Sequence, residues 1–459
     1  MSTLNEQLGS EPIGKLLLKF SIPAIAGMLV SSLYNLLDRI FVGRLGALAM
    51  TGIGLTLPFM TLLTAFTSLV GIGTSAIVSM RLGQNRKEDA EKVLGNAFSM
   101  LTVLMLVVTV IGLIFKEPIL TLLGASELTM GYASDYITII LIGSVFQGIG
   151  AGLSNVIRAE GHPAKATIVL VIGTVLDMIL NPLFIFTFNM GIAGAAWTTV
   201  LSATVTTILV IAHFVGKKSV LKLRIVNLKL SLPIVKDILS IGLSPFFMQI
   251  AAFIVGIISN NALKTYGGDV AIGAMTVVNA VMILFLMSAM GITQGAQPIL
   301  GFNYGAQQYD RVKKTLKLEL ALVTAICVFT FLMVQFFPTG LARILSNDLE
   351  LINAASHGMK IFLLMLPIIG AQIVGASYFQ AVGAAKKATF LGLLRQVITL
   401  IPMLIILPNF FGLTGVWAAA PTSDFISCSV AIVFVAREIK RLGKAEQHQA
   451  EVIEHRSLS

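Results

Sequence analysis

Long apolar runs, separated by short polar stretches, extend over almost the whole chain. A helix that crosses the hydrocarbon core of a bilayer needs about 20 mostly apolar residues. Twelve runs reach that length, at residues 17–42, 52–79, 94–115, 132–157, 166–188, 192–215, 238–263, 270–300, 318–338, 358–382, 388–410 and 414–436. The first run has no small-residue cleavage site after a short apolar core, so we interpret it as a span and not as a signal peptide. The pattern predicts an all-α membrane protein with twelve transmembrane helices.

The composition agrees with a membrane protein. Of the 459 residues, 56% are hydrophobic and only 12% are charged, whereas a soluble domain carries about 25% charged residues. Cys327 and Cys428 both lie in apolar runs, which supports neither a disulfide framework nor a thiolate metal site. The sequence has no glycine-rich nucleotide-binding loop and no histidine cluster with metal-site spacing. We therefore expect no cofactor and no enzymatic activity.

The positive charges fall mainly on one side of the predicted spans. If the N-terminus is cytoplasmic, 25 of the 32 Lys and Arg residues lie in the termini and the cytoplasmic loops, and six lie on the opposite side. Loops rich in Lys and Arg stay in the cytoplasm. We therefore predict a multi-pass protein of the cell membrane with both termini cytoplasmic. The net charge of +10 then reflects topology and not nucleic-acid binding.

The two halves of the sequence repeat each other in one constant register. This register aligns Pro23 with Pro245, Asp38 with Asn260, Gly73 with Gly295 and residues 158–161 with 380–383; one deletion later, Gly191 and Gly194 align with Gly412 and Gly415. Each half holds six spans, an even number, so both halves run in the same direction. A pseudo-two-fold axis along the membrane normal then relates two six-helix lobes, as in alternating-access transporters.

The repeat divides the chain into four regions. We predict an N-terminal lobe in residues 1–216 and a C-terminal lobe in residues 238–440. Residues 217–237 contain no apolar run long enough to span and are interpreted as a cytoplasmic linker. Residues 441–459 are interpreted as a polar cytoplasmic tail.

Asp38 is a candidate for ion coupling because its repeat mate Asn260 is uncharged. A low-dielectric environment disfavours the charged form of a carboxylate, so Asp38 is expected to take up a proton near neutral pH. Pairing with Arg39 is the alternative, but adjacent helical residues do not face each other. Pro23, earlier in the same span, weakens the helix locally and is predicted to be its hinge.

Asp177 and Asn181 form a second candidate site, in the fifth span. A spacing of four places both side chains on one helical face, where their oxygens could share a proton or coordinate a hard cation such as sodium. Pro182 follows at once and disturbs the helix there. The hydroxyls of Thr198 and Thr199, at the start of the sixth span, either add a ligand to this site or link helices. No other metal is expected.

Further polar residues in the spans are candidates for a substrate cavity. Such groups can hydrogen-bond a ligand, although they more often hold helices together. The candidates are Tyr34, Asn35, Asn155, Gln249, Asn260 and Gln372. Arg395 is expected to extend toward the cytoplasmic surface in preference to a gating role. Asp424 is either satisfied locally by Thr422 and Ser423 or functional.

Four segments carry a family resemblance. They are Phe20-Ser21-Ile22-Pro23, Arg158-Ala159-Glu160-Gly161, the stretch from Asp177 to Pro182, and Gly191-Ile192-Ala193-Gly194-Ala195-Ala196. Together with the repeat they resemble the multidrug and toxic compound extrusion family over about residues 10–440. Carboxylates in spans one and five are similar to its DinF/MepA-like branch, whereas the NorM-like branch has acids in spans seven and ten. The family pattern Asn-x3-Asp-Pro is reversed here to Asp-x3-Asn-Pro.

The resemblance implies two lobes that form a V around a central cavity, and antiport of drug-like substrates against protons or sodium. It also implies a cation site at Asp177, Asn181 and Thr199. We therefore predict a monomeric, ion-coupled multidrug efflux antiporter that exports amphipathic, often cationic, small molecules by alternating access, with the proton favoured over sodium. The alternative is a lipid-linked-sugar flippase of the wider superfamily, for which we would expect more cationic residues in the cavity.

Overall fold

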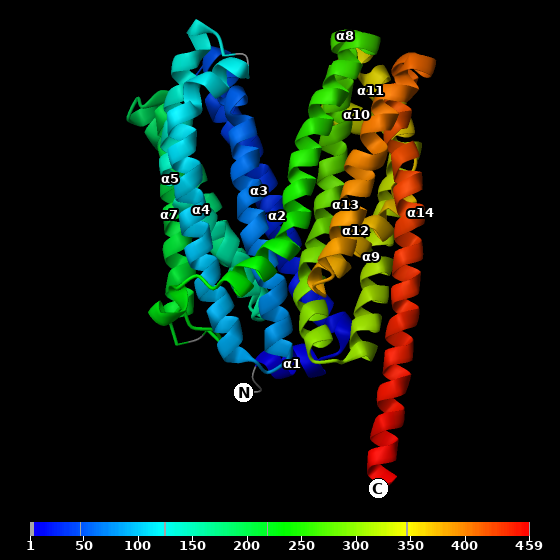
Figure 1. Cartoon of the computed structure of the whole chain (residues 1–459). Coiled ribbons are helices and arrows are strands. Elements are labelled where there is room, and N and C mark those ends of the chain that lie inside the picture. The colour runs from blue at the N-terminus through cyan, green and yellow to red at the C-terminus, as the bar shows by residue number, and fades with distance from the viewer. Residues whose placement is uncertain (1–3, 46, 124, 218, 346–347, 459) are drawn as a thin grey trace. The chain divides into compact units, whose positions relative to one another are not determined.

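The computed structural model describes residues 4–45, 47–123, 125–217, 219–345 and 348–458, without the side chains of residues 4–6, 33–40, 42–43, 47, 269, 284, 345 and 448–458. Every element in these ranges is helical (Figure 1). The elements are α1 (Leu4–Ser10), α2 (Ile13–Gly43), α3 (Ala47–Gly83), α4 (Lys87–Leu122), α5 (Glu127–Ala159), α6 (Pro163–Pro182), η1 (Leu183–Thr187), α7 (Gly191–Val215), η2 (Ile225–Leu228), α8 (Leu232–Gly305), α9 (Tyr309–Phe336), α10 (Pro338–Leu345), α11 (Leu349–Phe362), α12 (Leu366–Ala381), α13 (Ala385–Leu393), η3 (Leu394–Leu400) and α14 (Ile401–Leu458).

The described helices account for twelve spans. Ten are long and apolar enough to cross a bilayer, and α11 with α12, bent by 59° at their junction, forms an eleventh. The longest candidate, Ala385–Gln447, has 63 residues, about 95 Å of helix against the ~30 Å of one crossing. Gly412 breaks it with a φ of 54°, so that it crosses twice, up in orange and down in red in Figure 1. The predicted all-α membrane fold is confirmed.

Helix α4 shows why these helices belong in lipid. Val103, Val107, Val110 and Ile114 recur every three or four residues and are about half exposed. The opposite face, which includes Leu94, Leu101 and Met105, is fully buried against the rest of the bundle. A helix that is apolar on both faces is stable only where its outer face meets hydrocarbon.

The internal repeat is visible in the backbone. Positive φ angles occur at Gly161 (99°) and Gly383 (75°), at Asn85 (58°) and Gln307 (59°), and at Gly191 (55°) and Gly412 (54°). The two members of each pair are repeat mates in the sequence alignment. A left-handed backbone is rare outside glycine, so its recurrence at equivalent positions shows that both halves make the same turns.

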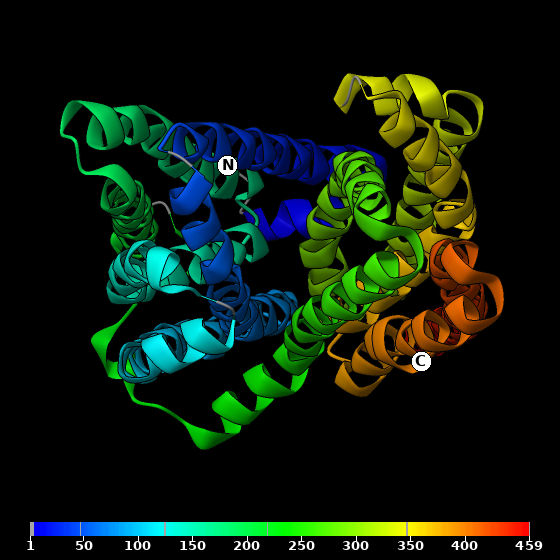
Figure 2. The same ribbon diagram turned by 90° about the horizontal axis from the view of Figure 1, so that it is seen from above.

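The chain forms two compact units, each a bundle of helices packed side by side (Figure 2). Unit 1 comprises Met1–Asn5 and Ala26–Gln249, and unit 2 comprises Glu6–Ile25 and Ile250–Ser459. The first part of α2 therefore packs with the C-terminal half of the chain, and the first part of α8 packs with the N-terminal half. The chain passes from one unit to the other just after Pro23 and just after its repeat mate Pro245.

Close helix packing explains this exchange of helix segments. A Cβ at Gly73 of α3 would overlap the carbonyl of Ile238 in α8, and a Cβ at Gly295 would overlap Ser21 of α2. Gly73 and Gly295 are repeat mates. Each glycine therefore allows close packing of a helix segment from the other half of the sequence. The two units thus differ from the division at residues 216 and 238 that the repeat alone suggests.

The predicted linker, residues 217–237, packs onto unit 1. Its backbone carbonyl at Asn227 approaches Gly95 so closely that a Cβ there would clash, and the amide of Ser231 donates to Asn96 Oδ1 at 2.7 Å. The Ser99 hydroxyl donates to the carbonyl of Leu228 at 2.7 Å. The linker is thus held along α4.

Candidate functional site

The fifth-span pair lies at the centre of unit 1, on α6. Asp177 and Asn181 are both buried, one helical turn apart. The Thr198 hydroxyl of α7 donates to Asn181 Oδ1 at 3.2 Å, whereas the neighbouring Thr199 donates to the carbonyl of Ala195 in its own helix. The Thr198 hydroxyl also lies 2.9 Å from the Ala195 carbonyl. Thr199 lines the same cavity as Asp177, and its role in a cation site stays a prediction.

Asp177 borders a cavity of about 160 Å³ between α5, α6 and α7. Its wall is formed by Gln147, Gly150, Ala151, Leu170, Gly173, Thr174, Asp177, Thr199, Ser202, Ala203 and Thr206. That volume holds a few waters of about 30 Å³ each, while pockets for drug-sized ligands measure about 300–1,000 Å³. The cavity thus has room for an ion with several waters.

The hydroxyls around the cavity present acceptor oxygens. Thr174, Thr199 and Thr206 each donate their only hydroxyl hydrogen to a carbonyl four residues earlier, at 3.0, 3.1 and 2.9 Å. Each hydroxyl oxygen retains lone pairs that can accept a hydrogen bond. Together with the carboxylate of Asp177 they give the cavity the chemistry to receive a proton donor or a cation.

The local backbone favours this opening. A Cβ on Gly173 would collide with the Thr206 hydroxyl, and a Cβ on Gly150 would come within 2.8 Å of Thr207 Oγ1, so glycine is needed at both positions for the three helices to meet. Pro182 ends α6, and the π-helical stretch η1 follows it. Interruptions of this type are frequent at functional sites in helices.

The other predicted site residues are distributed as follows. The side chains of Tyr34, Asn35 and Asp38 lie outside the described residues, so the roles predicted for them stay predictions. Pro23 is half-buried within α2, which continues through it as a helix. Its predicted hinge role also stays a prediction.

The remaining cavity candidates do not converge on the unit 1 cavity. Asn155 Oδ1 accepts from Arg158 at 3.0 Å, and Gln372 in unit 2 donates to the Leu391 carbonyl at 3.3 Å. Gln249 is half-buried and Asn260 is exposed, both on α8. The structure thus gives Asn155 and Gln372 partners inside their own units.

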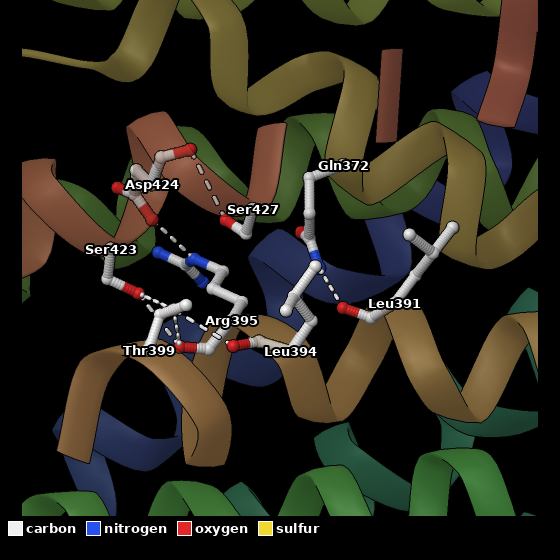
Figure 3. A network of polar contacts seen from close by, with 8 residues as sticks. All are labelled: Gln372, Leu391, Leu394, Arg395, Thr399, Ser423, Asp424 and Ser427. Carbon is white, nitrogen blue, oxygen red and sulfur yellow. Dashed lines mark hydrogen bonds and ion pairs between the residues drawn. The ribbon is translucent and has the colours of Figure 1, made fainter. Parts of the chain in front are cut away.

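Unit 2 contains an ion pair between partly buried Arg395 and buried Asp424 at the equivalent place. Arg395 Nε donates to Asp424 Oδ1 at 2.6 Å (Figure 3). The expectation that Arg395 extends to the cytoplasmic surface is wrong, because Asp424 holds its side chain inside. Asp424 is satisfied by Arg395 and not by Thr422, whose hydroxyl donates to its own helix. The Ser423 hydroxyl instead donates to the Arg395 carbonyl at 2.9 Å.

The sequence analysis gave no role to four buried acids, Glu91, Glu160, Glu319 and Glu438. Glu160, within the Arg-Ala-Glu-Gly segment, contacts His213 and accepts from the Ser219 hydroxyl at 2.8 Å and the Leu221 amide at 3.2 Å, which fastens the linker to α5 and α7. Glu319 of α9 is fully buried, and neither carboxylate oxygen has a hydrogen-bond partner among the described residues. For Glu319 the available signal was a lone acid in the predicted span 318–338.

The MatE family model matches the chain twice, at residues 23–183 and 245–405. The two matches begin at the repeat mates Pro23 and Pro245, and together they cover more than half of the chain. The chain belongs to the MatE family. MatE proteins are membrane transporters, so the chain is a transporter and not an enzyme, as predicted.

Relatives match the MatE chain over nearly its full length. It is 29% identical to the multidrug export protein MepA of Staphylococcus saprophyticus over 438 residues, 94% of this chain and 95% of the relative. It is 28% identical to MepA of Staphylococcus aureus strain MSSA476 over 437 residues, 93% of this chain and 95% of the relative.

Two solved structures share the fold. The crystal structure of MATE in complex with MaL6 matches with a TM-score of 0.90 at 23% identity, over 97% of this chain and 100% of that one. The outward-facing conformation of a multidrug resistance MATE family transporter of the MOP superfamily matches with a TM-score of 0.89 at 24% identity, over 95% and 98%. The MatE fold is therefore shared at low sequence identity.

Proposed function

We propose that this MatE protein is an ion-coupled multidrug exporter that moves amphipathic, often cationic, small molecules out of the cell by alternating access. Its relatives MepA are named multidrug export proteins and align along almost the entire chain. The observation that carries ion coupling is the carboxylate of Asp177 at the wall of a small polar cavity. A cavity of that size separates the ion from a larger substrate.

The proton is proposed as the coupling ion. A proton needs one carboxylate and a hydrogen-bonding neighbour, whereas sodium needs several oxygen ligands held at once. The reversed order of Asp177 and Asn181 leaves the amide outside the cavity wall and bonded to Thr198. The sodium alternative would place the ion among Asp177, Asn181 and Thr199.

Efflux of a fluorescent lipophilic cation from proteoliposomes tests the coupling. The wild type should export under a pH gradient in sodium-free buffer. Asp177→Asn and Asp38→Asn should each abolish gradient-driven export, because an amide cannot carry a proton. Asp135→Asn, which neutralises an exposed carboxylate on α5 of the same unit, is the matched control and should export normally. Export by Asp177→Asn at the wild-type rate would contradict the proposal.

The choice of ion has its own experiment. In the double variant Asp177→Asn, Asn181→Asp, the carboxylate moves to the family position. Export should follow the pH gradient without sodium in both the wild type and this variant. Export by the wild type only under a sodium gradient would assign the coupling to sodium.

The flippase alternative lacks a matching feature in the described cavity. None of the residues that line the unit 1 cavity is Lys or Arg, the groups that would hold a pyrophosphate. Transfer of a pyrophosphate-linked lipid between leaflets, without export of the lipophilic cation, would favour that alternative.

The proposed topology places both termini in the cytoplasm. Cys327 and Cys428 are buried, so an added cysteine can be labelled selectively. In intact cells a membrane-impermeant thiol reagent should label Leu128→Cys, at the exposed start of α5, and spare Gln447→Cys. The opposite pattern would invert the topology. The monomeric state is proposed with it and is measured by the mass of the purified particle.

A further inference from the structure

The repeat places large polar residues of unit 2 where unit 1 has small residues in its cavity wall. The register that pairs Pro23 with Pro245 also pairs Gly150 with Gln372 and Gly173 with Arg395. In α7 and α14 the register is one residue shorter, as the left-handed glycines Gly191 and Gly412 show. That register pairs Ala203 with Asp424, Ser202 with Ser423 and Thr206 with Ser427.

Contacts between the helices support this register. In unit 1 the position of a Cβ on Gly173 lies 3.5 Å from the carbonyl of Ser202. In unit 2 the repeat mates are also neighbours, because the Ser423 hydroxyl donates to the Arg395 carbonyl at 2.9 Å. The Arg395 side chain therefore extends from the position at which Gly173, its repeat mate, has no side chain.

The side chains of unit 2 fill that space. Figure 3 shows the guanidinium of Arg395 directed at the carboxylate of Asp424, with Gln372 on the adjoining helix. Gln372, Arg395 and Asp424 each carry a larger side chain than their repeat mates Gly150, Gly173 and Ala203 in the unit 1 cavity wall. A separate pocket of about 40 Å³ that touches Arg395 lies among apolar residues of α8, α9 and α12, such as Met282, Phe285 and Ile369.

We propose that Arg395 is a built-in cation of unit 2, held permanently by Asp424 at the position where unit 1 keeps a cavity for an exchangeable cation. A guanidinium keeps its charge at any physiological pH and cannot leave its chain. Its short, charge-assisted hydrogen bond to a buried carboxylate is costly to break. The unit 2 site is thus always occupied by a cation. The proposal rests on the proposed function in one respect, the assignment of ion exchange to Asp177 of unit 1.

Removing the arginine side chain should convert its place into a cation site. Arg395→Gly restores the residue type of unit 1 and leaves Asp424 facing an empty, guanidinium-shaped space. Free guanidinium at millimolar concentration is the probe, and urea, which has the same shape and no charge, is its control. Binding is measured on the purified full-length protein by calorimetry and by the melting temperature.

The proposal expects saturable binding of one guanidinium per chain to Arg395→Gly, with a rise in melting temperature, and no effect of urea. The wild type, the double variant Arg395→Gly, Asp424→Asn, and the control Arg343→Gly, which removes an exposed arginine of α10, should not bind. Absence of binding to well-folded Arg395→Gly, or equal binding after Asp424→Asn, would overturn the proposal.

A second experiment keeps the proposal testable if Arg395→Gly folds poorly. Arg395→Lys keeps a cation in the site and should fold, and Arg395→Gly should be recovered when guanidinium is present during purification. Failure of guanidinium to recover Arg395→Gly while Arg395→Lys folds would also overturn the proposal. Because these readouts do not depend on transport, they stay informative if Asp177→Asn proves to export normally, a result that would count against the proposed function alone.

Discussion

The cavity of unit 1 and the ion pair of unit 2 occupy equivalent positions of one internal repeat, and they handle charge in different ways. In unit 1 the carboxylate comes from α6, at Asp177, and small residues of α5, α6 and α7 leave room beside it. In unit 2 the carboxylate comes from α14, at Asp424, and an arginine fills the room. The same backbone therefore supports an open site in one half and a neutralised site in the other.

The difference shows how a duplicated fold can become asymmetric with few substitutions. At three positions a small residue of unit 1 corresponds to a larger one in unit 2, where it closes the space. Gly150 corresponds to Gln372, Gly173 to Arg395 and Ala203 to Asp424. A cation that belongs to the chain needs no entry path and no release step. Under the proposed function, the half that retains the space is the one that exchanges an external ion.

Removal of the carboxylate should have opposite consequences in the two units. Asp177→Asn should fold like the wild type and lose gradient-driven export, because its charge serves exchange. Asp424→Asn should lower the free energy of unfolding by about 3–5 kcal/mol, because it leaves Arg395 buried without a partner. Melting temperatures and efflux rates of both variants measure the contrast; similar stability losses in the two would contradict it.

A single methyl group should close part of the unit 1 cavity. Gly173→Ala would push against the Thr206 hydroxyl, and overpacking of this kind costs about 1–3 kcal/mol. We expect lower stability and slower export. Gly131→Ala, at a position with nothing within 4 Å of the new Cβ, is the control. Unchanged export by a stable Gly173→Ala variant would show that the cavity does not limit the cycle.

Glu319 provides a test of unpaired charge in unit 2. Its carboxylate is fully buried without a hydrogen-bond partner among the described residues, whereas Asp424 is paired. Replacing an unpartnered polar group by an apolar one of similar size removes a desolvation cost of about 1–3 kcal/mol. Glu319→Met should therefore raise the melting temperature. A lower melting temperature would indicate that the carboxylate has a partner of its own.

The smallest effect is expected at the point where the chain passes between the units. Pro23 lies just before unit 1 resumes at Ala26, and a proline within a helix removes one backbone hydrogen bond. Pro23→Ala should slow export while equilibrium binding of substrate changes by no more than a few fold. Pro245→Ala, at the repeat mate, shows whether both passages contribute. Unchanged export by Pro23→Ala would show that Pro23 is not a hinge of α2.

Sequence reasoning was most successful where a property depends on neighbours along the chain. The apolar runs set the helices because a bilayer requires a fixed length of apolar helix. The pairing of Asp177 and Asn181 on one face followed from helical periodicity. The sequence repeat alone pairs Gly191 with Gly412, and both residues have a left-handed backbone.

It was least successful where partners lie far apart in the chain. Arg395 was expected to reach the surface because the sequence shows only its distance from the end of a span. Asp424, 29 residues later, captures it. Thr198 and Thr199 are equivalent in sequence, and only the packing of α7 on α6 places Thr198 against Asn181 and Thr199 at the cavity beside Asp177.

The sequence by itself determined the family, the twelve spans and the internal repeat, because hydrophobic length and repeated motifs are local properties of the chain. The tertiary structure decided which helices share a unit, where Gly150, Gly173 and Ala203 leave a cavity, and how Arg395 fills the equivalent place in unit 2. These features depend on distances between helices that are set by packing. Gly173 leaves a cavity, and Arg395 fills the equivalent place, only because a neighbouring helix packs beside each of them.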